Sequence, residues 1–263
     1  MKWLNLSLFI IILFSFFSCP SSPKEPPSKG KPKLSIAVAA NVQFAIKEII
    51  AAFESGYDAE VAVVIGSSGK LTAQIIQGAP YHLFISADTK YPEVLKEAGK
   101  ASGESMIYAK GALVLWTFDE TLDLARNPSF LLNDKIKKIA IANPVTAPYG
   151  EETVRLLEYY GLYEKLKNKL VLGESIAQTN QYISSAAVEV GITAKSVVVA
   201  PEMAGKGKWL DLERSAYNLI EQAAIITEYG HLNEPEASKA FLDFLRSKAG
   251  QQIFSQYGYE GLE

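Results

Sequence analysis

Cysteine and histidine are scarce in this chain and its basic residues are scattered, and each of these features removes a class of function. The 263 residues include one cysteine and two histidines, and the formal net charge is -3. A single cysteine forms no disulfide within the chain, so the fold must rest on its hydrophobic core. The 26 Lys and Arg residues form no basic stripe of the kind that binds a nucleic-acid backbone. We therefore expect no nucleic-acid partner.

Catalytic patterns are also missing from the sequence. His82 and His231 stand apart from other metal ligands at suitable spacing, and neither HExxH nor GxSxG occurs. The Walker pattern fails as well, because Val64 stands where glycine is needed and Leu71 follows Lys70 in place of Ser or Thr. These absences predict that the chain is not an enzyme and needs no cofactor.

The N-terminal segment differs in character from the rest of the chain. Its apolar run over residues 8–17 is shorter than the ~20 residues that cross a bilayer as a helix, so residues 1–18 are predicted to be a signal peptide. Cys19 directly follows a small residue, which resembles a bacterial lipobox with a lipidated cysteine. Phe16 and Phe17 depart from the usual lipobox residues. The alternative is an ordinary signal peptide with an incidental cysteine.

Residues 19–32 are rich in Pro, Ser and Lys and have no apolar periodicity. Such a segment cannot bury a core, so it is predicted to be a flexible tether that begins with the lipidated Cys19. This combination predicts a domain held by a lipid anchor on the periplasmic or extracellular face of a membrane.

From Leu34 onward, short apolar runs alternate with amphipathic helical patterns, which is typical of an α/β fold with mainly parallel sheets. Three β–loop–α units come first, with strands at 34–38, 61–65 and 83–86 and helices at 44–53, 70–77 and 91–98. Further strands are expected at 112–118, 138–142, 170–172, 190–193 and 223–227, and further helices at 151–160, 178–186, 235–247 and 250–256.

Two long strands, near Ala112 and Ala223, are placed to carry the chain between two lobes. The first lobe is predicted to hold residues 33–112 plus 222–263, and the second residues 113–221. A ligand would bind in the cleft between the lobes, at the carboxyl ends of the strands.

Four strand-to-helix junctions carry small or polar residues. A helix N-terminus has unpaired N–H groups and a partial positive charge, so it suits an anion. One such junction is weak evidence, because a serine there is usually a simple cap. Together, the four predict a cage of neutral donors around a tetrahedral oxyanion. The junctions span residues 39–41, 66–69, 146–150 and 174–178.

The sequence motifs of these junctions resemble the substrate-binding proteins of bacterial molybdate ABC transporters. The runs that carry the resemblance, between residues 33 and 259, are AAN, GSSGKLTAQI, GAPYHLFISAD, GALVLW, ANPVTAPYGEE, GESIAQT and QQIFSQYGY. The resemblance implies a two-lobed periplasmic binding protein fold of type II. Such a protein closes on molybdate or tungstate and delivers it to a membrane permease, and we expect it to act as a monomer.

The resemblance also implies a set of ligand-binding residues. Asn41 would supply a side-chain amide donor where the family often has serine, and Ser68 a hydroxyl donor, with Ser67 beside it. Tyr149 and Ile176 match positions that contribute backbone N–H groups. The anion would be bound through its oxygens, with no protein ligand on the metal itself.

Two positions depart from the family, and other functions stay open. Ala194 stands where some members have a tyrosine whose hydroxyl reaches the anion, and His82 replaces a common aspartate. The alternatives are a binding protein for sulfate, a small carboxylate or a sugar acid, and an enzyme or adhesin on the same scaffold. A carboxylate usually calls for an Arg fork, and the four junctions contain no arginine.

Overall fold

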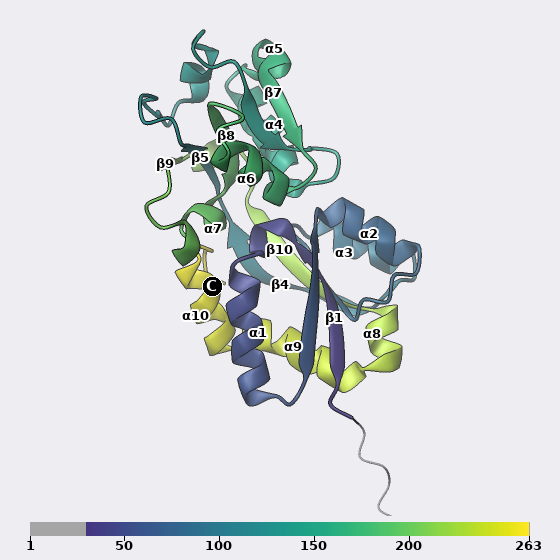
Figure 1. The fold of residues 1–263 in the computed structure, drawn as a ribbon. Helices are drawn as coiled ribbons and strands as arrows, with labels where there is room; N and C mark the ends of the chain where they lie inside the picture. The colour runs from purple at the N-terminus through teal and green to yellow at the C-terminus, as the bar shows by residue number, and fades with distance from the viewer. Residues whose placement is uncertain (1–29, 263) are drawn as a thin grey trace, which may run out of the picture. The chain divides into compact units, whose positions relative to one another are not determined.

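The structure is a computed structural model and describes residues 30–262. These residues form two five-stranded sheets with helices packed against them (Figure 1). The predicted signal peptide, Cys19 and most of the predicted tether lie outside the described residues. Both sheets belong to one compact unit that begins at Lys31.

The first sheet has the strand order β2-β1-β3-β10-β4. Successive side chains point to opposite faces: in β1, Ile36 and Val38 pack into one core, and Ala37 packs into the other. Both faces are therefore covered, as a buried α/β sheet requires. The strands are β1 (Lys33–Ala39), β2 (Glu60–Gly66), β3 (Leu83–Ile85), β4 (Ala101–Gly111) and β10 (Ile220–Thr227).

Helices cover the first sheet on both sides. One group, consisting of α1 (Ala45–Gly56), α9 (Pro235–Arg246) and α10 (Lys248–Gln256), packs on one face. The pair α2 (Ser68–Ile76) and α3 (Lys90–Glu97) packs on the other face, as Figure 1 shows. The short helix α8 (Glu228–Asn233) follows β10.

The second sheet has the strand order β7-β6-β8-β5-β9 and its own core. Its strands are β5 (Leu113–Thr117), β6 (Ile139–Ala142), β7 (Leu170–Gly173), β8 (Val190–Ala194) and β9 (Lys208–Asp211). Its helices are α4 (Pro148–Tyr159), α5 (Tyr163–Leu166), α6 (Ile176–Ser184) and α7 (Lys195–Val198). The 3-10 helices within residues 30–262 are η1 (Ala40–Val42), η2 (Pro128–Leu132), η3 (Lys167–Lys169), η4 (Pro201–Met203) and η5 (Arg214–Ala216).

The expectation of mainly parallel sheets is wrong, because both sheets are mixed. In the first sheet β1 pairs in parallel with β2 and β3, whereas β10 pairs antiparallel with β3 and β4. The second sheet repeats this division, with β6 in parallel pairs and β5 in antiparallel pairs. The antiparallel strands are those through which the chain enters or leaves a sheet, so no helical crossover on one face fixes their direction.

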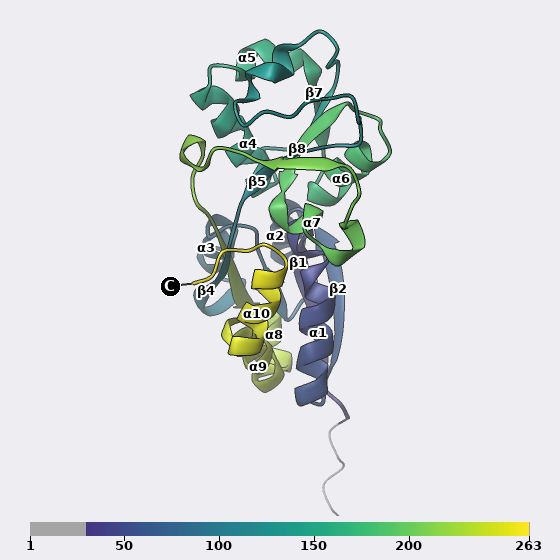
Figure 2. The same ribbon diagram turned by 90° about the vertical axis from the view of Figure 1, so that its left-hand side faces the viewer.

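The chain passes between the sheets at two places. It runs directly from β4 into β5, with only Ala112 between them (Figure 2), and it returns between β9 and β10. The strand expected at 112–118 is β5. The strands β4 and β9 and the short helices α5, α7 and α8 have no counterpart among the expected elements. Strand β10 begins two residues before the expected boundary at 222. The lobe boundaries as a whole stay a prediction.

Candidate functional site

A small cavity lies where the carboxyl ends of strands from both sheets meet. Five of the residues proposed for the anion site line it: Asn41, Ser67, Ser68, Tyr149 and Ile176. They come from η1 and α2 beside the first sheet and from α4 and α6 beside the second. All four predicted junctions therefore contribute to one cavity. The remaining lining residues are Ala39, Ala40, Ala87, Ala147 and Pro148.

Two adjacent serine hydroxyls stand at the start of α2. Ser67 is the N-cap residue, yet its side chain makes no capping hydrogen bond, and its buried Oγ has no partner among the described residues. The Oγ of Ser68 accepts from the N–H of Ala87 at 3.0 Å. A hydroxyl that accepts one hydrogen bond keeps its own proton to donate. The N-terminus of α2 thus offers two hydroxyl donors, and Ser67 is the less committed of the two.

Backbone N–H groups form the opposite side of the cavity. Tyr149 is the second residue of α4 and Ile176 is the first residue of α6. N–H groups in the first turn of a helix have no acceptor within the helix. The side chain of Ser175, the N-cap of α6, accepts a hydrogen bond from the N–H of Gln178 and not from the N–H of Ile176. These two helix ends can therefore donate to an anion without any side-chain charge.

Asn41 lines the cavity, but its amide nitrogen is already used. Nδ2 donates to Gln222 Oε1 at 2.7 Å and to Tyr259 Oη at 3.2 Å. Its buried Oδ1 has no partner among the described residues. The backbone carbonyl of Asn41 accepts from Ser196 in α7 and from Tyr259, both at 2.9 Å. The side-chain donor that the sequence assigns to Asn41 thus points away to Gln222, and its role toward an anion stays a prediction.

Behind the cavity lies a buried network of neutral groups. Gln222 Oε1 accepts from the hydroxyl of Tyr108 at 2.8 Å, and Gln222 Nε2 donates to the hydroxyl of Tyr149 at 3.0 Å. Burial raises the pKa of both tyrosines well above their usual value, so both phenols stay neutral. The network joins Asn41 on one side of the cavity to Tyr149 on the other.

No charged side chain is among the described residues that line the cavity. Lys70, which follows the serines in α2, pairs instead with Glu174 next to α6, and both side chains are about half exposed. This ion pair joins the start of α2 to the residue that precedes the N-cap of α6. Asp88, which follows Ala87, has a pKa raised by burial and partly offset by hydrogen bonds from Tyr91 N–H and Ser86.

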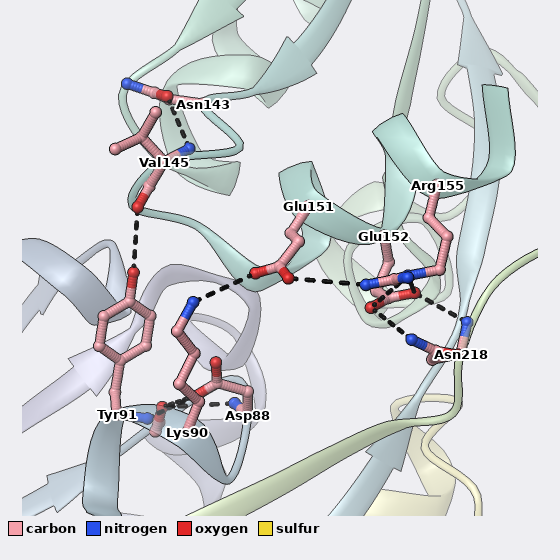
Figure 3. A network of polar contacts seen from close by, with 10 residues as sticks. Asp88, Lys90, Tyr91, Asn143, Val145, Glu151, Glu152, Arg155 and Asn218 are labelled. Carbon is pink, nitrogen blue, oxygen red and sulfur yellow. Dashed lines mark hydrogen bonds and ion pairs between the residues drawn. The ribbon is translucent and has the colours of Figure 1, made fainter. Parts of the chain in front are cut away.

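Further contacts join the two sides around the rim, as Figure 3 shows. The hydroxyl of Tyr91 in α3 donates to the carbonyl of Val145 at 3.2 Å, and Lys90 Nζ lies 3.6 Å from a carboxylate oxygen of Glu151 in α4. The N–H of Gly69 donates to the carbonyl of Thr146 at 2.9 Å. A Cβ at Gly69 would lie 2.7 Å from Tyr91 Oη, so glycine permits this close approach.

Two positions from the sequence analysis do not line the cavity, and one lining position was missed. Ala194 is fully buried at the end of β8 but is not a lining residue. His82 accepts a hydrogen bond from the N–H of Ser35 through Nδ1 and packs against Tyr229. Ala87 lines the cavity after β3. The signal for it was present, since it follows the third parallel strand just as Asn41 follows the first.

Comparison with known proteins identifies the family. The family described as bacterial extracellular solute-binding protein matches residues 34–260. This chain belongs to that family. A solute-binding relative, the molybdate-binding protein ModA of Rhodobacter capsulatus, is 37% identical over 85% of this chain and 86% of its own length. A putative ABC transporter substrate-binding lipoprotein of Bacillus subtilis, YvgL, is 27% identical over 96% of this chain and 97% of its own length.

Solved structures of solute-binding proteins have the same architecture. The periplasmic molybdate-binding protein of Azotobacter vinelandii matches with a TM-score of 0.82 at 30% identity, over 88% of this chain and 100% of that chain. The expected two-lobed type II fold and the resemblance to molybdate-binding proteins are both confirmed. Within residues 30–262, no helix is long and apolar enough to cross a membrane, and no cluster of three or more His, Cys, Asp or Glu side chains is placed to hold a metal ion.

Proposed function

We propose that this protein captures molybdate, and tungstate with it, for an ABC importer. The observation that carries the proposal is the cavity, which is lined by two serine hydroxyls and by the N-termini of α4 and α6, with no charged side chain among its described lining residues. Several hydrogen bonds to one anion, each contributing about 1.5–3 kcal/mol, balance a dianion without Arg or Lys. The relatives named molybdate-binding protein support the same ligand.

The size and polarity of the cavity favour a small, fully deprotonated anion. Its volume is about 10 Å³, far below the range of about 300–1,000 Å³ typical of pockets for larger organic ligands. Donors suit the bare oxygens of molybdate and tungstate, whereas a protonated phosphate would bring a donor of its own and leave it unpaired. Sulfate has the same charge but shorter bonds, so fixed donors spaced for the larger anion would bind it loosely.

Binding, rather than catalysis, fits the chemistry of the cavity. The one titratable side chain among its described lining residues is Tyr149, whose phenol is kept neutral because burial raises its pKa. A neutral phenol that is bonded to Gln222 supplies no acid–base pair. We infer that the bound anion leaves unchanged and that closure of the two lobes presents it to a permease.

Calorimetry on the purified protein tests the proposal. Molybdate and tungstate are expected to bind with similar affinity, sulfate about 100-fold more weakly, and phosphate without detectable heat. Absence of binding to molybdate, or equal affinity for sulfate, would overturn the assignment. A thermal-shift panel of the same anions gives an independent measure, because a ligand that binds only the folded state raises the unfolding temperature.

We also propose that Cys19 carries a lipid and holds the domain at the outer face of the membrane as a monomer. The lipoprotein relative YvgL supports the anchor. Replacing Cys19 with serine should release the protein from the membrane fraction and remove the lipid mass from its N-terminus. Unchanged membrane association would contradict the anchor, and light scattering on the released protein measures its oligomeric state.

A further inference from the structure

Gln222 is the one side chain that bonds residues on both sides of the cavity among the described hydrogen bonds. It lies in β10, fully buried, and its two amide atoms meet Asn41 Nδ2 at 2.7 Å and Tyr149 Oη at 3.0 Å. A Cβ at Gly111 would collide with Tyr149 Oη and lie 2.5 Å from Gln222 Nε2. Glycine in β4 therefore makes room for this junction.

The arrangement leaves Asn41 with a side chain that does not suit an anion. Its donor group is turned toward Gln222 and Tyr259, and its Oδ1 is a buried acceptor without a partner. A buried acceptor without a hydrogen bond carries a free-energy cost, and an acceptor next to a dianion adds repulsion. Both costs disappear when the amide turns over and Oδ1 gains a donor.

We propose that Gln222 is the positioning residue that sets the direction of the Asn41 amide, and that anion binding reverses both amides together. The inference rests on the proposed capture of an oxyanion. In the reversed arrangement Gln222 Nε2 donates to Asn41 Oδ1, Gln222 Oε1 accepts from the Tyr149 hydroxyl, and Asn41 Nδ2 donates to the anion. The same atoms then satisfy one another with donor and acceptor exchanged.

The surrounding tyrosines permit the exchange because a hydroxyl both donates and accepts. The hydroxyl of Tyr108 lies 3.0 Å from the carbonyl of Ser86, so it can donate there when Gln222 Nε2 turns toward it. The hydroxyl of Tyr259, which donates to the carbonyl of Asn41 at 2.9 Å, can turn its proton to Asn41 Oδ1, because the carbonyl keeps the hydrogen bond from Ser196. Neither needs to ionise, so the exchange moves hydrogen bonds and no net charge.

Three single variants test the positioning role through molybdate affinity. Gln222→Glu keeps the shape but, when ionised, offers only acceptors, so it holds Asn41 Nδ2 away from the anion. We expect an affinity loss of about 100-fold. Gln222→Leu frees the Asn41 amide without anchoring it, and we expect the affinity for molybdate to fall about 10-fold. If Gln222 served only to fill space, Gln222→Leu would weaken binding more than Gln222→Glu.

Gln251→Leu is the control. It removes hydrogen bonds at 2.8 Å to the carbonyls of Tyr108 and Leu245 only, and should leave the affinity for molybdate unchanged.

A double variant separates misdirection of the Asn41 amide from repulsion between the introduced carboxylate and the anion. In an Asn41→Ala background the affinity loss caused by Gln222→Glu should fall about 10-fold, because no amide remains to be misdirected, whereas repulsion alone keeps the full loss.

The outcomes separate this inference from the proposed function. Wild-type binding of molybdate with no coupling between positions 41 and 222 overturns the positioning role and leaves the proposed function standing. A wild-type protein that binds none of molybdate, tungstate and sulfate overturns both. The unfolding temperature of each free variant shows whether a loss of affinity comes from a loss of fold.

Discussion

The interior of the cavity and its rim are built from opposite kinds of residue. The described residues that line the cavity are neutral and buried, and they present hydroxyl and N–H donors. The rim carries ion pairs between half-exposed side chains, such as Lys90 with Glu151 and Lys70 with Glu174. The cavity thus presents fixed neutral groups, while ion pairs join its two sides outside it.

Because of this difference, we expect the interior to determine affinity and the rim to affect closure. Buried donors held by helix ends are screened little by salt, so they can supply a strong and selective interaction. Exposed ion pairs contribute about 0–1 kcal/mol each and weaken as salt rises. We therefore expect changes in the interior to affect which anion binds and how tightly, and changes at the rim to make small, salt-dependent differences.

Placing a negative charge in the interior should have the largest effect. Ser68→Asp puts a carboxylate beside the N–H of Ala87 and at the first residue of α2, where a helix favours negative charge. The side chain would occupy the place of the anion and repel it, so we expect molybdate affinity to fall more than about 1,000-fold while the free protein stays folded. Ser184→Asp, on the exposed end of α6, adds the same charge as a control. Calorimetric affinity within tenfold of wild type would contradict the neutral cage.

Removing one hydroxyl from the interior should have a smaller effect. Ser67→Ala deletes a buried Oγ that has no partner in the described residues, and loss of its bond to a charged ligand should weaken molybdate binding about 10- to 100-fold. Ser238→Ala is a matched control, since its Oγ is equally buried and unpartnered but lies in α9. Ser68→Ala should also weaken binding, although less, because it frees the N–H of Ala87, a residue that lines the same cavity. Titration calorimetry that shows no loss for either serine would remove α2 from the site.

Neutralising the rim should have a weaker effect that depends on salt. Lys90→Gln removes the ion pair with Glu151 that joins α3 to α4, and we expect a two- to threefold loss of affinity at low salt that vanishes at high salt. Lys96→Gln is the control, because its partners Glu93 in α3 and Glu104 in β4 both belong to the first sheet and its helices. A loss that persists at high salt would show that Lys90 acts on the anion itself rather than on closure.

The four junctions that line the cavity were easier to predict from the sequence than parts of the fold. Each junction follows a strong apolar run, so strand, loop and helix could be located without tertiary contacts. Strand β4 could not be, because residues 101–105 are small or polar and Gly103 adopts a positive φ. That strand is held by pairing with β10, a partner more than 100 residues away in the sequence. Register shifts in this pairing disturb the alternation of apolar and polar residues by which a strand is predicted from sequence.

The role of Asn41 shows a second limit of sequence reasoning. Its side chain was assigned as a donor from the family resemblance, but its partners Gln222 and Tyr259 come from β10 and from the end of the chain. Their convergence depends on the return of the chain from the second sheet, which no local pattern encodes. Local junction chemistry is therefore readable from sequence, whereas the hydrogen-bond direction of a buried amide is set by tertiary structure.

A titrating group far from both cavity and rim should affect stability and leave binding alone. Burial lowers the pKa of His82 from its ordinary value of 6.5, so the unfolded chain takes up a proton more readily than the folded one. The stability that neutral His82 contributes is therefore present above pH 6.5 and is lost as the pH falls through the lower folded-state pKa. In His82→Gln, which removes the titrating group, the unfolding free energy should fall less between about pH 7 and pH 5 than in the wild type, as measured by denaturant titration.

Molybdate affinity should stay the same in both proteins, because His82 contacts Ser35 and Tyr229 and lines no part of the cavity. A change in affinity that follows the pH dependence of His82 would mean that the first sheet transmits the protonation of His82 to η1. His82 would then have to be counted among the residues that control anion binding.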